Sequence, residues 1–232
     1  MITIRKSNER GQTKIDWLDS RHSFSFGEYH DPAHMGFHSL RVINDDRVAP
    51  GAGFGSHPHR DMEILTYMVN GVLEHKDNLG NGSLIRPGEI QRMSAGTGIV
   101  HSEFNPSKTE VAHLLQIWIL PERRGIAPGY EQRAFSPEQK LNKFCLLASP
   151  TGEADSVKVH QNIRLSCAIL EPGRELNQNS RSGQAVWLQV AQGAVKINEH
   201  YLNAGDAAAV EGDETLRIHA NEKSEILLFE MN

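Results

Sequence analysis

Glycine, proline, asparagine and aspartate punctuate this chain about every ten residues and divide it into short segments of the length of β-strands. Several of these segments alternate apolar and polar residues, which is the pattern of strands with one buried face. Such a series of short strands is typical of an all-β sandwich or barrel, and it argues against alternating strands and helices. The strands predicted in the first half cover residues 40–43, 64–69, 72–76, 83–85, 90–93, 99–104 and 113–120.

The turn signals of the first half recur in the second half. Asn70-Gly71 is a strong β-hairpin signal, because both central residues of a type I′ turn need a positive φ. The strand before it has a counterpart in the strand before Gln192-Gly193, and Pro87-Gly88 has a counterpart in Ala204-Gly205. We therefore expect two β units in tandem.

The expected domain boundaries follow from this repeat. The first domain covers residues 1–120, a connecting segment rich in Pro, Arg and Glu covers residues 121–150, and the second domain covers residues 151–232. Helix is scarce, and Ser136-Pro137-Glu138 is expected to begin one short turn of it. The predicted fold class is all-β, with two antiparallel β-barrel or jelly-roll domains and little helix.

The composition excludes several classes of protein. With 38% hydrophobic and 23% charged residues, the chain has the composition of an ordinary globular protein, and no apolar run approaches the span of a bilayer. The net charge is 24 − 29 = −5, and no basic cluster extends beyond Arg123-Arg124, so we expect no direct binding to nucleic acid. The first residues lack the apolar core of a secretory signal, which indicates a cytoplasmic protein. Cys145 and Cys167 lie among apolar residues and are expected to be small buried side chains rather than a disulfide or a thiol catalyst.

Histidine is concentrated in the first half, where nine of the twelve lie at or before His113. His57-Pro58-His59 places two imidazoles at positions i and i+2, which point to the same face of an extended strand. His101-Ser102-Glu103 does the same with an imidazole and a carboxylate. If the fold brings these pairs together, three neutral nitrogens and one anionic oxygen converge. That donor set suits a divalent transition metal with open positions, whereas a structural zinc site is typically closed and often rich in thiolates.

Other interpretations of these residues stay open. A single His-x-His pair is often a solvent-facing strand edge, but two pairs in one domain, each after a glycine-rich turn, favour a metal site. Glu63 competes with Glu103 for the fourth ligand position. His75 is expected on a solvated hairpin beside charged neighbours, and His113 is expected to be structural. Among apolar residues, Phe54, Met93 and Phe104 are candidates to line a pocket.

The sequence resembles a known family over nearly its whole length. Gly51, His57, His59, Glu63 and Gly71 resemble the first cupin motif, and Gly88, Ser94, Gly96, His101 and Asn105 resemble the second. The departures are one additional residue before Gly71, Ser94 where many cupins have Pro, and two additional residues between Gly96 and His101. Together with the segments 24–46 and 93–103, these departures closely resemble the pirin family within the cupins.

The resemblance implies a bicupin whose first barrel holds one metal through residues matching His57, His59, His101 and Glu103. The metal is usually iron, and Fe(II) is the expected ion, although Zn, Mn, Co, Ni or Cu suit the same donors. It also implies a quercetin 2,3-dioxygenase activity on a flavonol-like aromatic with O2, in which Glu103 serves as ligand and candidate base. The alternative is a metal- or redox-dependent regulatory protein that acts through a protein partner.

The second unit is expected to lack a metal. Counting from Gly193 as from Gly71, and from Gly205 as from Gly88, places Asn179, Arg181, Ile218 and Ala220 at the positions of the four candidate ligands. None of these four residues is a histidine or has a carboxylate side chain, so metal-dependent chemistry is expected in the first unit alone.

Overall fold

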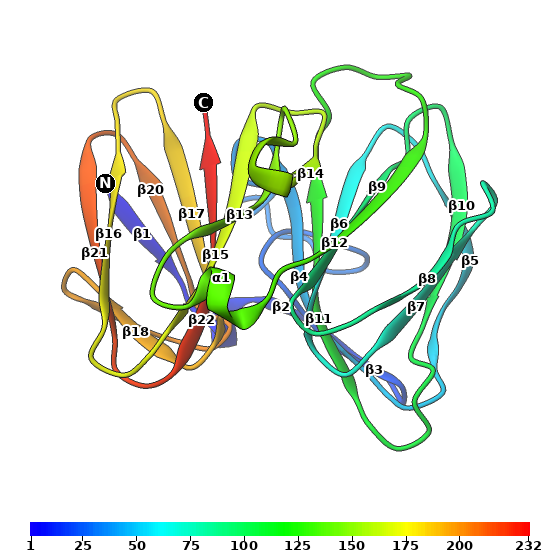
Figure 1. The fold of residues 1–232 in the computed structure, drawn as a ribbon, viewed down its shortest axis with the longest axis horizontal. Coiled ribbons are helices and arrows are strands. Elements are labelled where there is room, and N and C mark those ends of the chain that lie inside the picture. Colours follow the sequence, from blue (N-terminus) through cyan, green and yellow to red (C-terminus); the bar gives the residue numbers. More distant parts are fainter. The chain divides into compact units, whose positions relative to one another are not determined.

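The computed structural model describes residues 1–232 and consists of β-strands almost throughout (Figure 1). This confirms the predicted all-β bicupin with little helix. The one α-helix, α1 (Pro137–Lys140), starts at Ser136 with a capping box and Pro137 in its first turn, as the sequence predicts. None of the helices has the length and apolar composition that crossing a bilayer would require.

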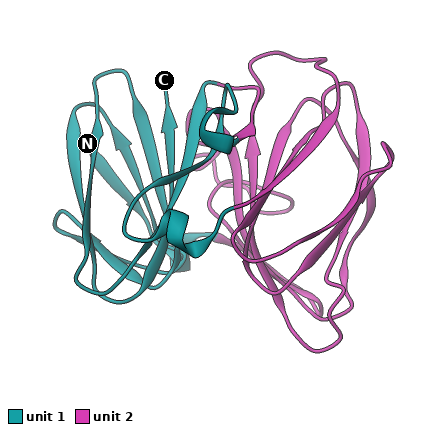
Figure 2. Ribbon diagram, viewed as in Figure 1, with its two compact units in different colours: residues 1–10, 135–156, 162–232 teal, residues 11–134, 157–161 magenta.

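The chain forms two compact units that are not contiguous in sequence (Figure 2). One contains residues 11–134 and 157–161, and the other contains residues 1–10, 135–156 and 162–232. This differs from the linear boundaries expected at residues 120 and 150. Strand pairing explains the difference: β1 (Ile2–Arg5) pairs with β20 (Ala207–Glu211), and β12 (Gly129–Ala134) pairs with β9 (Glu89–Ser94).

The unit of residues 11–134 and 157–161 contains two antiparallel sheets. The larger has seven strands in the order β12-β9-β6-β11-β4-β3-β2, and the smaller has four in the order β5-β10-β7-β8. Besides β9 and β12, the strands are β2 (Gly11–Lys14), β3 (Leu18–His22), β4 (Leu40–Val48), β5 (Gly53–His59), β6 (Glu63–Asn70), β7 (Leu73–Asp77), β8 (Gly82–Ile85), β10 (Ile99–Phe104) and β11 (Ala112–Ile119). The short β14 (Val157–Lys158) lies beside β12, where the Lys158 backbone N–H donates to Glu131.

The hairpin predicted at Asn70-Gly71 is wrong. The strand before it, β6, belongs to the seven-stranded sheet, and the strand after it, β7, belongs to the four-stranded sheet. Only Gly71 has a positive φ, and a Cβ on it would lie 2.7 Å from the Val111 carbonyl oxygen. The glycine is therefore needed for a close chain passage between sheets, not for a type I′ turn.

Alternation along β10 separates the core of this unit from its surface. Ile99, His101 and Glu103 are buried, whereas Val100 and Phe104 are exposed. Two apolar clusters fill the interior away from the histidines. One contains Leu18, Val48, Met68, Leu73, Ile85, Ala112 and Leu114, and the other contains Ile64, Met93, Ala95 and Ile99.

The other unit repeats the arrangement of a larger and a four-stranded sheet. The larger follows the order β1-β20-β17-β22-β15-β13, and the smaller follows β16-β21-β18-β19. The further strands are β13 (Cys145–Ser149), β15 (Ile163–Leu170), β16 (Glu175–Ser180), β17 (Ala185–Gln192), β18 (Ala194–Ile197), β19 (His200–Asn203), β21 (Glu214–Ala220) and β22 (Ser224–Met231). Its interior is a continuous apolar core to which both sheets contribute.

Candidate metal centre

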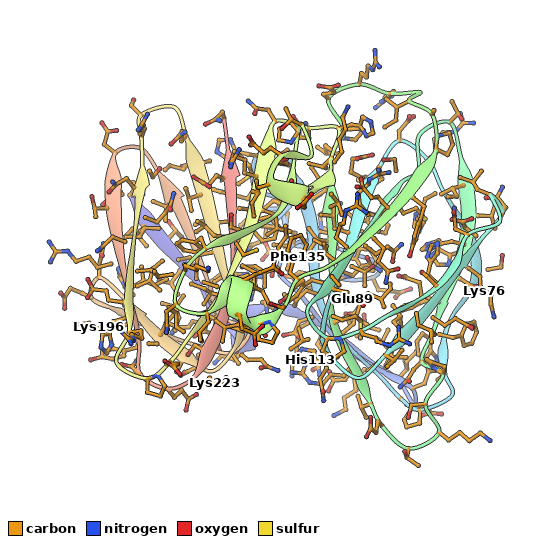
Figure 3. The ribbon with its side chains drawn as sticks, viewed as in Figure 1. Lys76, Glu89, His113, Phe135, Lys196 and Lys223 are labelled. Atoms are coloured by element: carbon orange, nitrogen blue, oxygen red, sulfur yellow. The ribbon has the colours of Figure 1, made fainter.

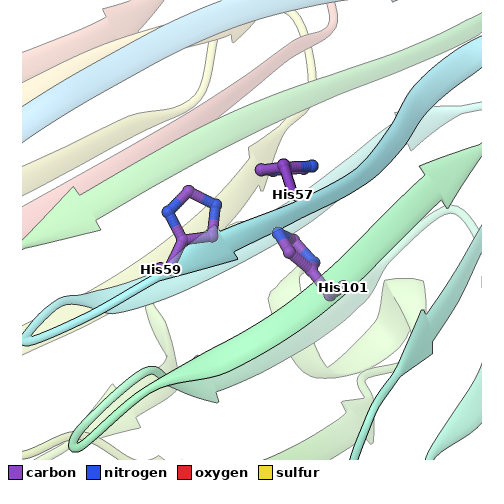
Figure 4. Close-up of side chains that lie close together, drawn as sticks. All are labelled: His57, His59 and His101. Carbon is purple, nitrogen blue, oxygen red and sulfur yellow. The ribbon is translucent and has the colours of Figure 1, made fainter.

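Three histidines from two neighbouring strands meet on the inner face of the four-stranded sheet (Figure 4). His57 and His59 share a face of β5, and their ring centroids lie 4.8 Å apart. His101 on β10 stands directly opposite His57 in the strand register. Its ring centroid lies 4.5 Å from that of His57 and 4.9 Å from that of His59. Nitrogens of the three rings lie within 4.8 Å of one another, which is the convergence that the two sequence pairs require.

Hydrogen bonding and burial leave these rings ready to bind a cation. His57 Nδ1 lies 2.7 Å from the Gly55 carbonyl oxygen. Because that oxygen only accepts, Nδ1 carries the proton and Nε2 keeps its lone pair. His101 Nε2 is buried without a partner. A buried unpaired nitrogen is costly, and an ion shared with two other imidazoles would satisfy it.

The local electrostatics keep the His59 and His101 imidazoles neutral. Burial, followed by the charge of His57, lowers the pKa of His59 to about 4. Burial and then the charges of the neighbouring histidines lower the pKa of His101 to about 3. Metals bind the neutral ring, so the cluster suits a divalent transition metal at neutral pH.

Glu103 lies next to this cluster but faces a second group of donors. Its carboxylate lies within 4.8 Å of ring nitrogens of His75 and His101. Gln116 Nε2 donates to its Oε2 at 2.8 Å, and the Thr66 hydroxyl lies 3.3 Å from its Oε1. Burial raises the pKa of Glu103. The structure therefore brings His57, His59 and His101 together and places Glu103 on the His101 side of them.

Glu63, the rival for the fourth position, is held elsewhere. Its Oε2 accepts the His160 backbone N–H at 3.0 Å and lies 3.1 Å from His160 Nδ1. Glu63 belongs to neither group of converging donors.

The prediction of a solvated His75 is wrong. His75 is fully buried on β7, opposite Glu103 in the strand register. Its charged neighbours Glu74 and Lys76 face outward, and Lys76 is exposed (Figure 3). The i, i+2 relation of His75 to Asp77 could have revealed this, since both lie on the inner face when Lys76 points to solvent.

A cavity of about 270 Å³ opens beside the histidines, and its accessible wall is mostly apolar. Phe54 lines it, as predicted. Met93 lies instead in a separate core cluster, and Phe104 is exposed, so neither contributes to the wall. Both sheets and the segment between β3 and β4 supply the lining, which includes Leu18, His22, Phe26, Gly27, Asn44, Asp46, His57, His59, Glu103, Gln116 and Trp118.

Two further histidines of this unit, His22 and His113, have structural contacts. His22, which the sequence could not place, lies in the cavity wall with its Nδ1 2.7 Å from Asn44 Oδ1. His113 pairs with Asp45 at 2.8 Å, in agreement with a structural role (Figure 3).

The other unit has three apolar side chains and one amide, Gln178, at the corresponding positions. Ile218 and Ala220 on β21 are fully buried, and Leu176 stands opposite Ile218 as His57 stands opposite His101. Asn179 and Arg181 are exposed and lie three residues beyond the true counterparts, because β16 runs two residues further than β5 and the turn before β17 is one residue longer than the turn before β6. This unit holds no comparable donor cluster.

Two protein-family models match successive parts of the chain. The family model Pirin matches residues 3–119, and a model described as the quercetinase C-terminal cupin domain matches residues 146–231. A quercetin 2,3-dioxygenase of Escherichia coli K12 is 49% identical over 100% of this chain and 99% of its own length. A putative quercetin 2,3-dioxygenase of Pasteurella multocida, PM1685, is 41% identical over the full length of both chains.

Solved structures resemble the chain equally closely. YhhW from Escherichia coli matches with a TM-score of 0.95 at 48% identity, over 100% of this chain and 98% of its own. Bacterial pirin YhhW in complex with nickel(II) matches with a TM-score of 0.94 at 48% identity, over 100% and 99% of the two chains.

Proposed function

The chain belongs to the pirin family, and from that premise we propose that it is a metal-dependent dioxygenase that opens the heterocyclic ring of flavonol-like aromatics with O2 and releases carbon monoxide. The observation that carries the proposal is the meeting of three histidines at the wall of a mostly apolar cavity. A relative of 49% identity is named quercetin 2,3-dioxygenase, which supports the same reaction.

We assign the metal to His57, His59, His101 and Glu103. The unpartnered His101 Nε2 and the tautomer of His57 fit a cation at this position. The donor set accepts Fe(II), which we propose as the native ion, as well as Zn, Mn, Co, Ni or Cu. The nickel complex of a pirin of 48% identity supports a divalent ion in this fold.

When bound, the metal supplies a Lewis acid that makes a coordinated hydroxyl more acidic and orients the substrate. Glu103 is the residue of this site suited to take the hydroxyl proton. Burial raises its pKa, so its carboxylate is a stronger base than an exposed glutamate. Gln116 Nε2 and the Thr66 hydroxyl hold the two carboxylate oxygens in place.

The cavity wall suits a planar aromatic substrate. Phe26 and Trp118 pack edge to face with centroids 5.4 Å apart, and the Trp118 ring also packs against His59 at 4.9 Å. Trp118 Nε1 is buried without an acceptor. A substrate oxygen that accepts from it would satisfy this donor and fix the orientation of the ring.

The proposed reaction conserves every atom. O2 adds across C2 and C4 of the deprotonated flavonol, and the two bonds from C3 to those carbons break. C3 leaves as carbon monoxide with its own oxygen, and both atoms of O2 stay in the ring-opened ester. The proton held on Glu103 returns to the carboxylate of the product.

Headspace analysis tests this assignment. Iron-loaded protein, mixed anaerobically with quercetin and then exposed to ¹⁸O2, should release unlabelled carbon monoxide and a doubly labelled ester. The control is the same protein after chelation. Carbon monoxide no higher than in that control contradicts the proposal, and it favours the regulatory alternative if metal binding is intact.

A further inference from the structure

We propose that His75 and Asp77 form a hydrogen-bond relay that holds the His101 ring in the tautomer able to bind metal. The inference rests on the proposed metal site, but it does not depend on the reaction catalysed there. Neither residue belongs to the ligand set. Both would act through His101, as positioning residues.

The strand register places the relay beside the metal site. β7 is the neighbour of β10, with Asp77 opposite His101 and His75 opposite Glu103. The side chains of His75 and Asp77 are both fully buried. Because the two residues are separated by one position, they lie on the same inner face as His101.

The direction of each hydrogen bond follows from the acceptor at the far end. Asp77 Oδ2 lies 3.2 Å from His75 Nε2. The carboxylate only accepts, so His75 carries its proton on Nε2 and its Nδ1 is an acceptor. Gln91 Nε2, a donor, lies 3.3 Å from that same Nδ1, which agrees with this tautomer.

The same logic fixes the tautomer of His101. Its Nδ1 lies 3.4 Å from His75 Nδ1, and a hydrogen bond to this acceptor requires the proton on His101 Nδ1. His101 Nε2 then keeps its lone pair, and this is the nitrogen that is buried without a partner. Both contacts to His75 Nδ1 are long, as expected when two donors share one lone pair.

The turn after β7 anchors the outer end of the relay. Asp77 Oδ1 accepts the backbone N–H groups of Leu79 at 2.9 Å and Asn81 at 3.0 Å. Asn81 Nδ2 also lies 2.9 Å from Oδ2. The Tyr130 ring packs on His75 with centroids 4.9 Å apart. These donors fix the position of the Asp77 carboxylate, which in turn orients the imidazoles of His75 and His101.

His75 could instead be a direct ligand, because His75, His101 and Glu103 form a second group of converging donors. The hydrogen bonds argue against this. Nε2 donates to Asp77, and the Nδ1 lone pair accepts from His101 and Gln91, so no lone pair of His75 is left for an ion.

The Asp77→Asn variant tests the relay. The Asn carbonyl would keep the contacts to the backbone N–H groups of Leu79 and Asn81. Its amide, in the place of Oδ2, would lose the contact with Asn81 Nδ2 and donate to His75 Nε2. His75 would then carry its proton on Nδ1, and His101 would be driven to the Nε2 tautomer, which blocks metal binding. Loss of an orienting carboxylate disturbs catalytic histidines in the same way.

Two readouts are independent of catalysis. Histidine-ring ¹⁵N spectra of metal-free protein should show His101 protonated at Nδ1 in the wild type and at Nε2 in Asp77→Asn. The affinity for Ni(II) should fall by about 10- to 100-fold in the variant, the range seen for outer partners of metal ligands. Asp45→Asn is the matched control, because Asp45 pairs with His113 away from the site and its loss should leave the affinity unchanged.

His75 variants separate the relay from direct ligation. His75→Gln keeps an acceptor and a donor and should stay within a few-fold of wild-type affinity, whereas His75→Leu should lose as much affinity as Asp77→Asn. Both variants should still bind one equivalent of Ni(II) at saturation. Unchanged His101 spectra in Asp77→Asn, or a metal equivalent that disappears with either His75 variant, overturns the proposal.

Discussion

At the residue scale, Glu103 combines full burial with two well-placed donors, Thr66 and Gln116. If it is the base, Glu103→Gln should lower kcat by about 10²- to 10⁴-fold, because a positioned base contributes that range. The three histidines should still retain metal in this variant. Single-turnover kinetics on samples matched for metal content measure the effect. A variant with full metal and unchanged kcat would exclude Glu103 as the base.

The lowered pKa of His101 predicts how the stability of the metal-free protein depends on pH. Its pKa is lowered to about 3 in the folded state, whereas an unfolded histidine titrates at about pH 6.5. Between these values the unfolded state binds the additional proton, so stability falls as pH falls. The slope from this histidine is up to about 1.4 kcal/mol per pH unit. Urea unfolding of protein from which a chelator has removed the metal should show this loss of stability between about pH 6.5 and 5.

The His101→Gln variant isolates this contribution. The contribution of Glu103 to the pH dependence of stability has the opposite sign. Because its pKa is raised, the folded state binds more protons than the unfolded state at pH values just above the ordinary pKa of glutamate. Glu103 is present in both proteins, so the difference between them reports on His101. The variant should lose stability less steeply as the pH falls. Equal slopes for the two proteins would contradict the lowered pKa.

At the element scale, alternation within strands explains which parts of the site were predictable. His57-Pro58-His59 and His101-Ser102-Glu103 each place two donors on one face, and that relation needs only the sequence. Which face of β7 is buried could not be decided in the same way. The expected hairpin at Asn70-Gly71 put His75 on a solvated edge, whereas the chain in fact crosses there between sheets.

This crossing gives a stability prediction. Gly71 has φ 76°, and a Cβ there would lie 2.7 Å from the Val111 carbonyl oxygen. Gly71→Ala should therefore lower the free energy of unfolding by about 1–3 kcal/mol. Gly82→Ala is the control, since Gly82 has no positive φ and its nearest neighbour to a new Cβ is 3.9 Å away. Urea unfolding of both variants measures the difference, and equal losses would refute the steric explanation.

At the scale of the whole molecule, the repeat in the sequence predicted two β units of which one carries the donors. It did not predict that residues 1–10 join the unit of residues 135–156 and 162–232. Ile2–Arg5 pairs with Ala207–Glu211, about two hundred positions away, and no local pattern specifies a partner at that separation. The same limit applies to β12, whose pairing with β9 extends the first unit past residue 120.

Metal removal should therefore affect the two units differently. A ligand that binds only the folded state stabilises the unit that holds it. Chelation should increase amide hydrogen exchange in β5 and β10, and it should leave exchange in β16 and β21 unchanged. Mass spectrometry of peptides from these strands measures both. An equal increase in the two pairs of strands would contradict a single metal in the unit of residues 11–134 and 157–161.

We propose that a metal held by His57, His59 and His101 supports oxygen chemistry in the adjacent cavity. The most direct test is elemental analysis combined with O2 uptake, with quercetin as substrate, on the wild type and His101→Ala. We expect about one metal per wild-type chain with quercetin-dependent O2 uptake, and loss of both in the variant. A His101→Ala protein that keeps its full metal and its O2 uptake would contradict it.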